Sequence, residues 1–188
     1  MPNYCQNELY FNQEDALKNV LEFMGEKFDF GKLIPYPDNY AKRDADANAI
    51  RVKHNKNWDE RTQADRDAEQ ADWQKFTEVY GNKKDGFNSG GYEWCIENWG
   101  TKWGAINARI EGDHLVFETA WSPPTPVIVA LAKKFPEYTF YFEYFEGGAA
   151  FCGGFTLPNR DDYYGDEPWY PGIITYEWEG RYSGHKGG

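Results

Sequence analysis

Two short stretches of the sequence carry the side chains best suited to binding an anion. Trp99, Lys102 and Trp103 lie in WCIENWGTKW, and Trp121 and Ser122 lie in TAWSPP. A helix capped by Ser122 would offer unpaired N–H groups and the positive end of its dipole to a phosphate, and the indole rings could stack on a base. The pattern therefore predicts a pocket for a nucleotide-like small molecule. The alternative is a tryptophan cluster that closes the end of the core, with Lys102 paired to an acidic residue.

Carboxylates in the C-terminal part of the chain form a second candidate site, for a protein partner. The chain has 31 acidic and 20 basic residues and a formal charge of −11. This charge disfavours direct nucleic-acid binding, which depends on Lys and Arg, and favours a partner with a basic surface. The residues expected to form this surface are Glu143, Glu146, Asp161, Asp162, Asp166 and Glu167. The alternative is a solvated sheet face without a partner.

Metal and cofactor binding are not expected. His54, His114 and His185 are scattered along the chain. The tight acidic cluster at 161–167 lacks the alternating ligand spacing of a calcium loop, so a solvated turn is the preferred interpretation.

Catalysis is not expected either. No serine or cysteine lies in a nucleophile elbow, and Cys5, Cys95 and Cys152 are interpreted as small buried apolar residues. One alternative is that removal of Met1 exposes Pro2 as a secondary-amine base, as in tautomerase-like enzymes.

The odd number of cysteines does not fit a disulfide framework, and no stretch resembles a membrane span or a signal peptide. We therefore expect a cytoplasmic, non-enzymatic protein.

The elements that would position these residues begin with a βα unit. Residues 5–11 alternate as a strand, and Asn12 is a candidate cap for a helix that runs to Phe28. The apolar stripe of this helix consists of Leu17, Val20, Leu21, Met24 and Phe28. Residues 41–91 then form a charged helical insertion, with a helix behind Asn57 as its cap and a flexible glycine-rich loop at the end.

A hairpin follows, and its register decides where the tryptophans lie. Residues 105–119 are expected to form two strands joined by a two-residue Gly-Asp turn. This turn sets Ile106 opposite Thr119. Continued outward, the same register places Trp103 opposite Ser122, so the two tryptophan-bearing stretches should be neighbours.

A second helix and a second hairpin complete the core. Ser122 is the expected cap of a helix entered through two prolines. The residues of this helix expected to face the core are Val127, Ile128, Leu131 and Phe135. Residues 139–157 form two strands joined by a Gly-Gly turn, with Phe142 opposite Gly153 so that the glycine makes room for a ring. A further strand is expected at 173–179.

This element order predicts an α+β fold with a ferredoxin-like βαββαβ antiparallel sheet, a helical insertion after the first helix and a C-terminal β extension. "Ferredoxin-like" names a strand order here and not an iron–sulfur cluster. We expect a single domain over 1–188, with a core at 1–40 and 92–157. The helical insertion then occupies 41–91, and the acidic, aromatic extension occupies 158–188.

Four stretches of the chain resemble the YubB ferredoxin-like family of plasmid and bacteriophage proteins of unknown function. They are Met1–Asn7, Trp94–Trp103, Thr119–Pro124 and Glu143–Gly154. The sequence departs from the family pattern at Tyr4, where the family tends to have Trp, and in its C-terminal extension. The resemblance implies a ferredoxin-like core and a mobile-element origin, and it carries over no catalytic residue.

The expected function combines the resemblance with the charge. We expect a phage- or plasmid-encoded accessory protein that binds and blocks a host component, such as a host defence protein, through its acidic surface. The alternative is a protein that sequesters a nucleotide signal in the tryptophan-lined pocket. Either protein would act in the cytoplasm of the bacterial host cell.

Overall fold

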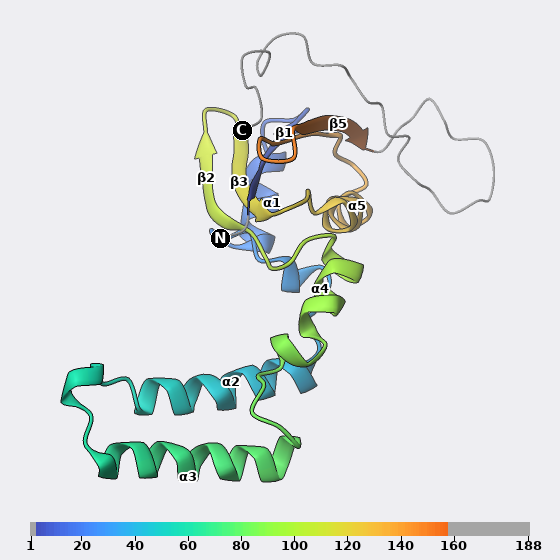
Figure 1. The fold of residues 1–188 in the computed structure, drawn as a ribbon. Coiled ribbons are helices and arrows are strands. Elements are labelled where there is room, and N and C mark those ends of the chain that lie inside the picture. The colour runs from blue at the N-terminus through green and yellow to red at the C-terminus, as the bar shows by residue number, and fades with distance from the viewer. Residues whose placement is uncertain (1–2, 158–188) are drawn as a thin grey trace. The chain divides into compact units, whose positions relative to one another are not determined.

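The computed structural model describes residues 3–157 of the chain (Figure 1). The fold divides into two compact units: one runs up to Pro35 and resumes at Cys95, and the other spans Tyr36–Trp94. The first unit contains a five-stranded sheet, and the second is helical. The predictions that lie outside the described residues concern Pro2, the acidic cluster at 161–167, the strand at 173–179 and His185.

Five antiparallel strands form the sheet of the first unit. They are β1 (Tyr4–Phe11), β2 (Ile106–Glu111), β3 (His114–Ala120), β4 (Phe140–Glu146) and β5 (Phe151–Leu157). Their spatial order is β2-β3-β1-β4-β5, and every neighbouring pair is antiparallel. The first four strands have the order of a split-βαβ, or ferredoxin-like, sheet, and β5 is added beside β4. The predicted α+β fold class is confirmed.

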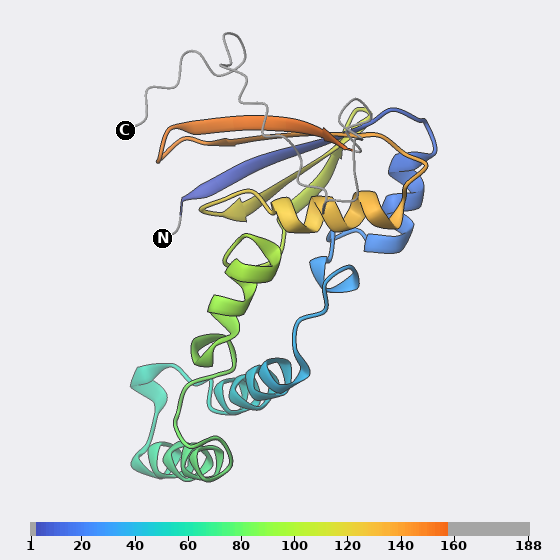
Figure 2. The same ribbon diagram turned by 90° about the vertical axis from the view of Figure 1, so that its right-hand side faces the viewer.

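Two helices, α1 (Ala16–Met24) and α5 (Thr125–Lys134), cover one face of this sheet (Figure 2). Because side chains alternate along each strand, every second residue lies under these helices. Leu9, Phe117 and Phe142 are fully buried there, and the ring centroids of the two phenylalanines lie 6.5 Å apart. The core of this unit therefore lies between the sheet and its two helices.

The opposite side of the sheet bears none of the described helices, and we call it the outer face. It consists of Gln6, Glu8 and Tyr10 on β1, Arg109 and Glu111 on β2, His114, Val116 and Glu118 on β3, and Tyr141 and Glu143 on β4. Most of these side chains are polar or charged, as alternation between a buried and a solvated face predicts.

Helix α1 is shorter than the sequence pattern predicts. It ends at Met24 because Gly25 follows with a positive φ of 77°. The predicted cap Asn12 has another role: its side-chain oxygen accepts a hydrogen bond from the Thr139 N–H at 2.9 Å, which ties the end of β1 to the start of β4. Phe28 lies beyond the helix but is fully buried, as are Val20 and Met24. Leu17 and Leu21 are only partly buried, so the predicted stripe is right about three of its five residues.

The first hairpin follows the predicted register only beside its turn. An irregularity in β2 then shifts the pairing, so Ile106 lies opposite Glu118 rather than Thr119. Asn107 has a φ of 52°, a left-handed conformation that asparagine adopts more readily than most residues. The register prediction is therefore wrong beyond the bulge. Because β2 begins at Ile106, no strand pairing extends to Trp103.

The second hairpin has a four-residue loop, 147–150, where a two-residue turn was predicted. Phe142 consequently pairs with Phe155 rather than with Gly153, a shift of two residues that leaves each side chain on the predicted face. Gly153 lies opposite Tyr144, and a Cβ atom added at Gly153 would collide with the Tyr144 hydroxyl. The glycine does make room for a ring, but the ring is that of Tyr144.

In the second unit, α2 (Asp38–Lys53) and α3 (Gln63–Tyr80) lie side by side (Figure 1). Helix α3 begins with a capping box, in which the Thr62 hydroxyl accepts from the Asp65 N–H and the Asp65 carboxylate accepts from the Thr62 N–H. The predicted cap, Asn57, instead precedes a short 3₁₀ helix.

Charge pairs and a small apolar core join the two helices of this unit. The Asp72 carboxylate lies 2.6 Å from Lys53 Nζ and 2.8 Å from His54 Nε2. Along α2 and α3, the buried apolar residues are Ala47 and Phe76. The unit therefore depends on few buried side chains.

The segment 83–91, predicted as a loop, includes buried Asp85, whose carboxylate lies 2.6 Å from the Arg51 guanidinium. Helix α4 (Gly91–Trp99), which we did not predict, follows it.

The short 3₁₀ helices of the described chain are η1 (Phe30–Lys32), η2 (Trp58–Glu60) and η3 (Phe87–Ser89). Within residues 3–157, we find no helix with the length and hydrophobicity that a bilayer span requires.

Candidate functional site

Backbone and hydroxyl contacts bring the two tryptophan-bearing stretches together at one end of the sheet. The Thr101 hydroxyl donates to the Ala120 carbonyl oxygen at 2.9 Å, and the Ser122 hydroxyl donates to the Gly100 carbonyl oxygen at 2.6 Å. A Cβ atom added at Gly100 would lie 2.8 Å from Pro126 Cδ, so only glycine fits this close approach. The two stretches are neighbours, although strand register is not what holds them.

A buried polar network lies beneath this junction. The Asn7 side-chain amide donates to the carbonyl oxygens of Cys5 and Phe117 and to the Thr119 hydroxyl, at 2.9, 3.3 and 3.0 Å. Thr119 in turn donates to the Ser122 carbonyl oxygen at 2.7 Å. Asn7 and Thr119 are fully buried, so these bonds satisfy polar groups that water does not reach.

The predicted ligand-binding tryptophans have different environments. Trp99 is 9% exposed, donates from Nε1 to the Ile34 carbonyl oxygen at 2.8 Å and packs edge-on against Phe30. Trp121 is 49% exposed, and Lys102 Nζ lies 5.2 Å from the centroid of the Trp103 ring. Trp99 therefore fills the core and leaves no free ring face for a base.

The N-terminus of α5 also differs from the predicted anion site. Its N-cap residue is Pro124, and Ser122 does not cap it. The N–H groups of Val127 and Ile128 donate to the Pro124 carbonyl oxygen, and Pro126 has no N–H to offer. These contacts favour the alternative interpretation, in which this end of the core is closed.

A groove of about 390 Å³ lies elsewhere, on the outer face of the sheet. Its lining residues are Gln6, Glu8, Arg109, Glu111, His114, Val116 and Glu118. They come from three adjacent strands, β1, β3 and β2, and they lie at alternate positions as the pleat requires. We did not predict this site from the sequence, although the alternation in each predicted strand contained the signal.

Contacts within strands and between strands organise the groove. The His114 ring stacks on Tyr10 with centroids 4.4 Å apart, the Tyr10 hydroxyl donates to the Glu8 carboxylate, and His114 Nε2 lies 3.7 Å from the same carboxylate. Arg109 pairs with Glu111 at 2.6 Å along β2. These contacts hold the side chains of the groove in fixed positions relative to the sheet.

Acidic groups outnumber basic ones in the groove. Three carboxylates, those of Glu8, Glu111 and Glu118, face one guanidinium, that of Arg109, and one histidine. Glu143 on β4 adds to the excess because it lies directly opposite Glu8 in the sheet. Like charges opposite each other are destabilising, and a bound cation would relieve that repulsion. The arrangement thus suits an ammonium or guanidinium group better than an anion.

The predicted acidic surface includes one residue that does not lie on the surface. Glu146 is 1% exposed, and its carboxylate accepts hydrogen bonds from the N–H groups of Gly148 and Ala149. It stabilises the hairpin loop and cannot contact a partner. Glu143 is half-buried on the outer face. The remaining predicted residues, Asp161, Asp162, Asp166 and Glu167, lie outside the described residues.

The cysteines differ in exposure. Cys5 and Cys95 are buried, and Cys152 is partly exposed. Burial, together with the nearby charge of Glu146, raises the pKa of the Cys5 thiol to about 12. Cys5 is therefore a poor nucleophile, because the thiolate is the reactive form. Residues 3–157 contain no group of three or more His, Cys, Asp or Glu side chains placed to hold a metal ion.

Comparisons with known proteins concern the fold. Residues 98–173 match the family model described as the ferredoxin-like domain in Api92-like protein. The structure is similar to the crystal structure of a protein api92 from Yersinia pseudotuberculosis, with 11% sequence identity and a TM-score of 0.46. That similarity covers 90% of this chain and 100% of the other. No curated protein matches the sequence.

Proposed function

We propose that this chain is a non-enzymatic binding protein whose outer face binds a basic segment of a partner protein. The observation that supports the proposal is the groove itself, in which Glu8, Glu111 and Glu118 face a single arginine. In its specific form, the proposal is an accessory protein of phage or plasmid origin, related to the YubB family. Such a protein would act in the bacterial cytoplasm by blocking a host component, for example a defence protein.

Negative charge supports this function both before the partner makes contact and within the groove. The formal charge of −11 would attract a basic partner before contact and raise the association rate. Within the groove, the carboxylates of Glu8, Glu111 and Glu118 would then pair with individual lysine or arginine side chains. Both effects weaken as salt screens the charges, so binding should depend strongly on ionic strength.

Titration calorimetry with a short arginine-rich peptide tests the proposal on the full chain. We expect the peptide to bind the wild type, with an affinity that falls as salt is added. The double variant Glu8→Gln/Glu118→Gln should lose up to about fivefold in affinity for the peptide, since two partly exposed ion pairs are lost.

A matched control separates the groove from net charge. Glu22 and Glu26 are exposed and lie on the helix-covered side of the chain, and Glu22→Gln/Glu26→Gln removes the same two charges. The control should retain nearly the wild-type affinity. Equal losses in the two double variants would show that the peptide responds only to net charge, and the groove would have to be abandoned as the site.

A further inference from the structure

The two edges of the sheet are protected to very different extents. Edge strand β2 carries Arg109 and Glu111 and is distorted by the bulge between Ile106 and Arg109. Charges and bulges of this kind prevent another strand from pairing with an edge. Strand β5, the other edge within the described chain, has neither feature: its sequence FCGGFTL is uncharged, and it pairs with β4 in one unbroken register.

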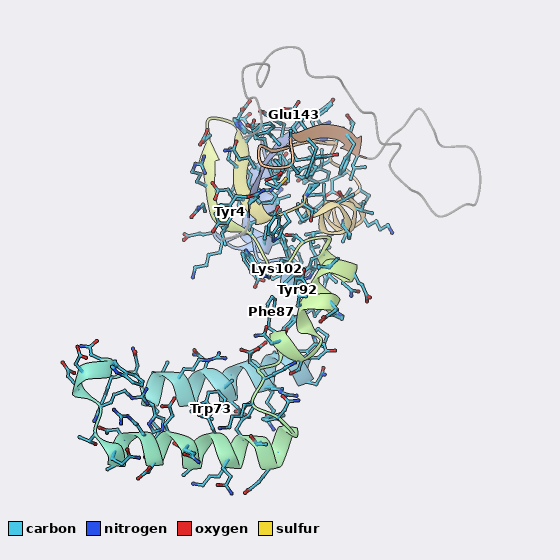
Figure 3. The ribbon with its side chains drawn as sticks, viewed as in Figure 1. Tyr4, Trp73, Phe87, Tyr92, Lys102 and Glu143 are labelled. Atoms are coloured by element: carbon cyan, nitrogen blue, oxygen red, sulfur yellow. The ribbon has the colours of Figure 1, made fainter. Side chains whose placement is uncertain are left out.

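Two glycines in β5 bring side chains of β4 close to this edge. Gly153 makes room for Tyr144 on the helix-covered side, where an added Cβ would collide with the tyrosine hydroxyl. Gly154 lies opposite Glu143 on the outer face, where an added Cβ would lie 2.8 Å from the Phe142 carbonyl oxygen and 3.4 Å from Glu143 Cγ. The Glu143 side chain, labelled in Figure 3, therefore starts next to the backbone of the edge strand.

The carboxylate at this position belongs to a row that crosses the sheet. Gly154, Glu143, Glu8 and Val116 lie opposite one another on β5, β4, β1 and β3. A long cationic side chain from a strand placed beside β5 could pass over Gly154, which has no side chain to block it, and approach Glu143.

We propose that β5 binds an extended segment of the partner protein as a sixth strand, with a lysine or arginine of that segment reaching across Gly154 to Glu143. The basic character of this segment rests on the proposed function of the outer face. Backbone hydrogen bonds to β5 would supply affinity, and the cationic side chain would supply specificity, as in other cases of strand addition. A second copy of this chain fits less well, since its β5 has no basic residue to offer.

The test uses three peptides of alternating threonine and lysine, each seven residues long to match β5. One has a normal backbone, and the other two are N-methylated at every second residue, one on each of the two alternate sets of N–H groups. N-methylation removes the donors needed for strand pairing and leaves the side-chain charges in place. Fluorescence anisotropy with the full chain gives the affinities.

One methylated version should bind at least about tenfold more weakly than the normal peptide, because several backbone hydrogen bonds are lost. Glu143→Gln should weaken binding of the normal peptide about fivefold, whereas the control Glu22→Gln should have little effect.

Three other outcomes would contradict strand addition. If all the peptides bind equally well, and Glu8→Gln/Glu118→Gln weakens their binding, strand addition is overturned and the proposed function stands. Binding of no peptide would overturn both proposals. A stable dimer, seen by sedimentation and unaffected by the peptide, would assign the edge to a second copy and overturn strand addition alone.

Discussion

Asn7 is a buried polar residue in a mostly apolar layer. Its amide makes three hydrogen bonds to groups on β1 and β3, and one of them continues through Thr119 to the turn that holds Trp121 and Ser122. A buried amide of this kind costs free energy unless every bond is made, and here it fixes the position of a turn. Asn7 therefore helps to fix the turn that carries Trp121 and Ser122, and the Thr101 and Ser122 hydroxyl groups join that turn to the other tryptophan-bearing stretch.

Replacement of Asn7 should destabilise the first unit strongly. Asn7→Ala removes one hydrogen bond from the Thr119 hydroxyl and one from each of two backbone carbonyl groups, so we expect the free energy of unfolding to fall by about 2–3 kcal/mol. Urea unfolding followed by tryptophan fluorescence measures this change. Asn48 is exposed on α2 and makes a suitable control, since Asn48→Ala should have an effect near zero. A similarly small effect at Asn7 would mean that the network contributes little.

Individual residues also explain which parts of the site could be predicted. The tryptophan-bearing stretches are neighbours as expected, but the burial of Trp99 depends on Phe30 and Ile34, which pack against it from a distant part of the sequence. Glu146 was expected on a surface, and its role became visible only once the loop length was known. The outer-face groove joins three strands, so no single stretch of sequence contains it.

At the level of elements, turn chemistry was a good guide to strands and a poor guide to register. Gly112 has a φ of 64°, and the tight turn that it permits set the nearby pairing as predicted. The bulge at Asn107 and the positive φ of 56° at Ala150 have no strong sequence signal, and both changed the register of a hairpin. Strand existence was therefore predictable from alternation, whereas strand alignment was decided by single backbone conformations.

Helices α2 and α3 are joined by ion pairs that should respond to acid. Hydrogen bonds from Lys53 and then His54 lower the pKa of Asp72 from 3.8 to about 2. Since the pKa is lower in the folded state, the stabilising contribution of Asp72 is present above about pH 4 and is lost as the pH falls toward 2.

Asp72→Asn should therefore lower the thermal stability of the second unit at neutral pH. The difference from wild type should shrink as the pH falls from about 4 to 2, because the wild-type carboxylate is then protonated as well. Thermal unfolding followed by circular dichroism at several pH values gives the comparison. Asp59→Asn removes the same charge from an exposed residue in η2 and should show no such pH-dependent difference. A difference at Asp72 that persists unchanged at pH 2 would contradict this assignment.

For the whole molecule, the division into two units implies two levels of stability. The first unit has an extensive core between sheet and helices, whereas α2 and α3 bury Ala47 and Phe76 between them. Units with few buried apolar contacts open more readily than large cores do. The charged second unit should thus be the first part of the described chain to exchange its amide hydrogens.

Phe76→Ala should open the second unit selectively. Removal of a buried phenylalanine costs about 3–5 kcal/mol, which is a large share of the stability of a unit with so small a core. Hydrogen exchange followed by mass spectrometry should show faster exchange in residues 36–94 and little change in β1 and β3. The control Val79→Ala alters a side chain that is 72% exposed and should leave both patterns intact. A loss of protection in β1 equal to that in α3 would show that the two units unfold together.

The strand order has a consequence for the way the chain folds. β1, at the start of the chain, lies between β3 and β4, and Asn7 meets Phe117 across 110 residues of sequence. During synthesis on the ribosome, β1 must therefore stay unpaired until β3 and β4 have been made. Contacts this distant in sequence slow folding, and an unpaired strand is exposed to aggregation during the delay. Strand β1 contains three consecutive polar residues, Gln6, Asn7 and Glu8. They should keep the unpaired strand from associating with other chains before β3 and β4 are available.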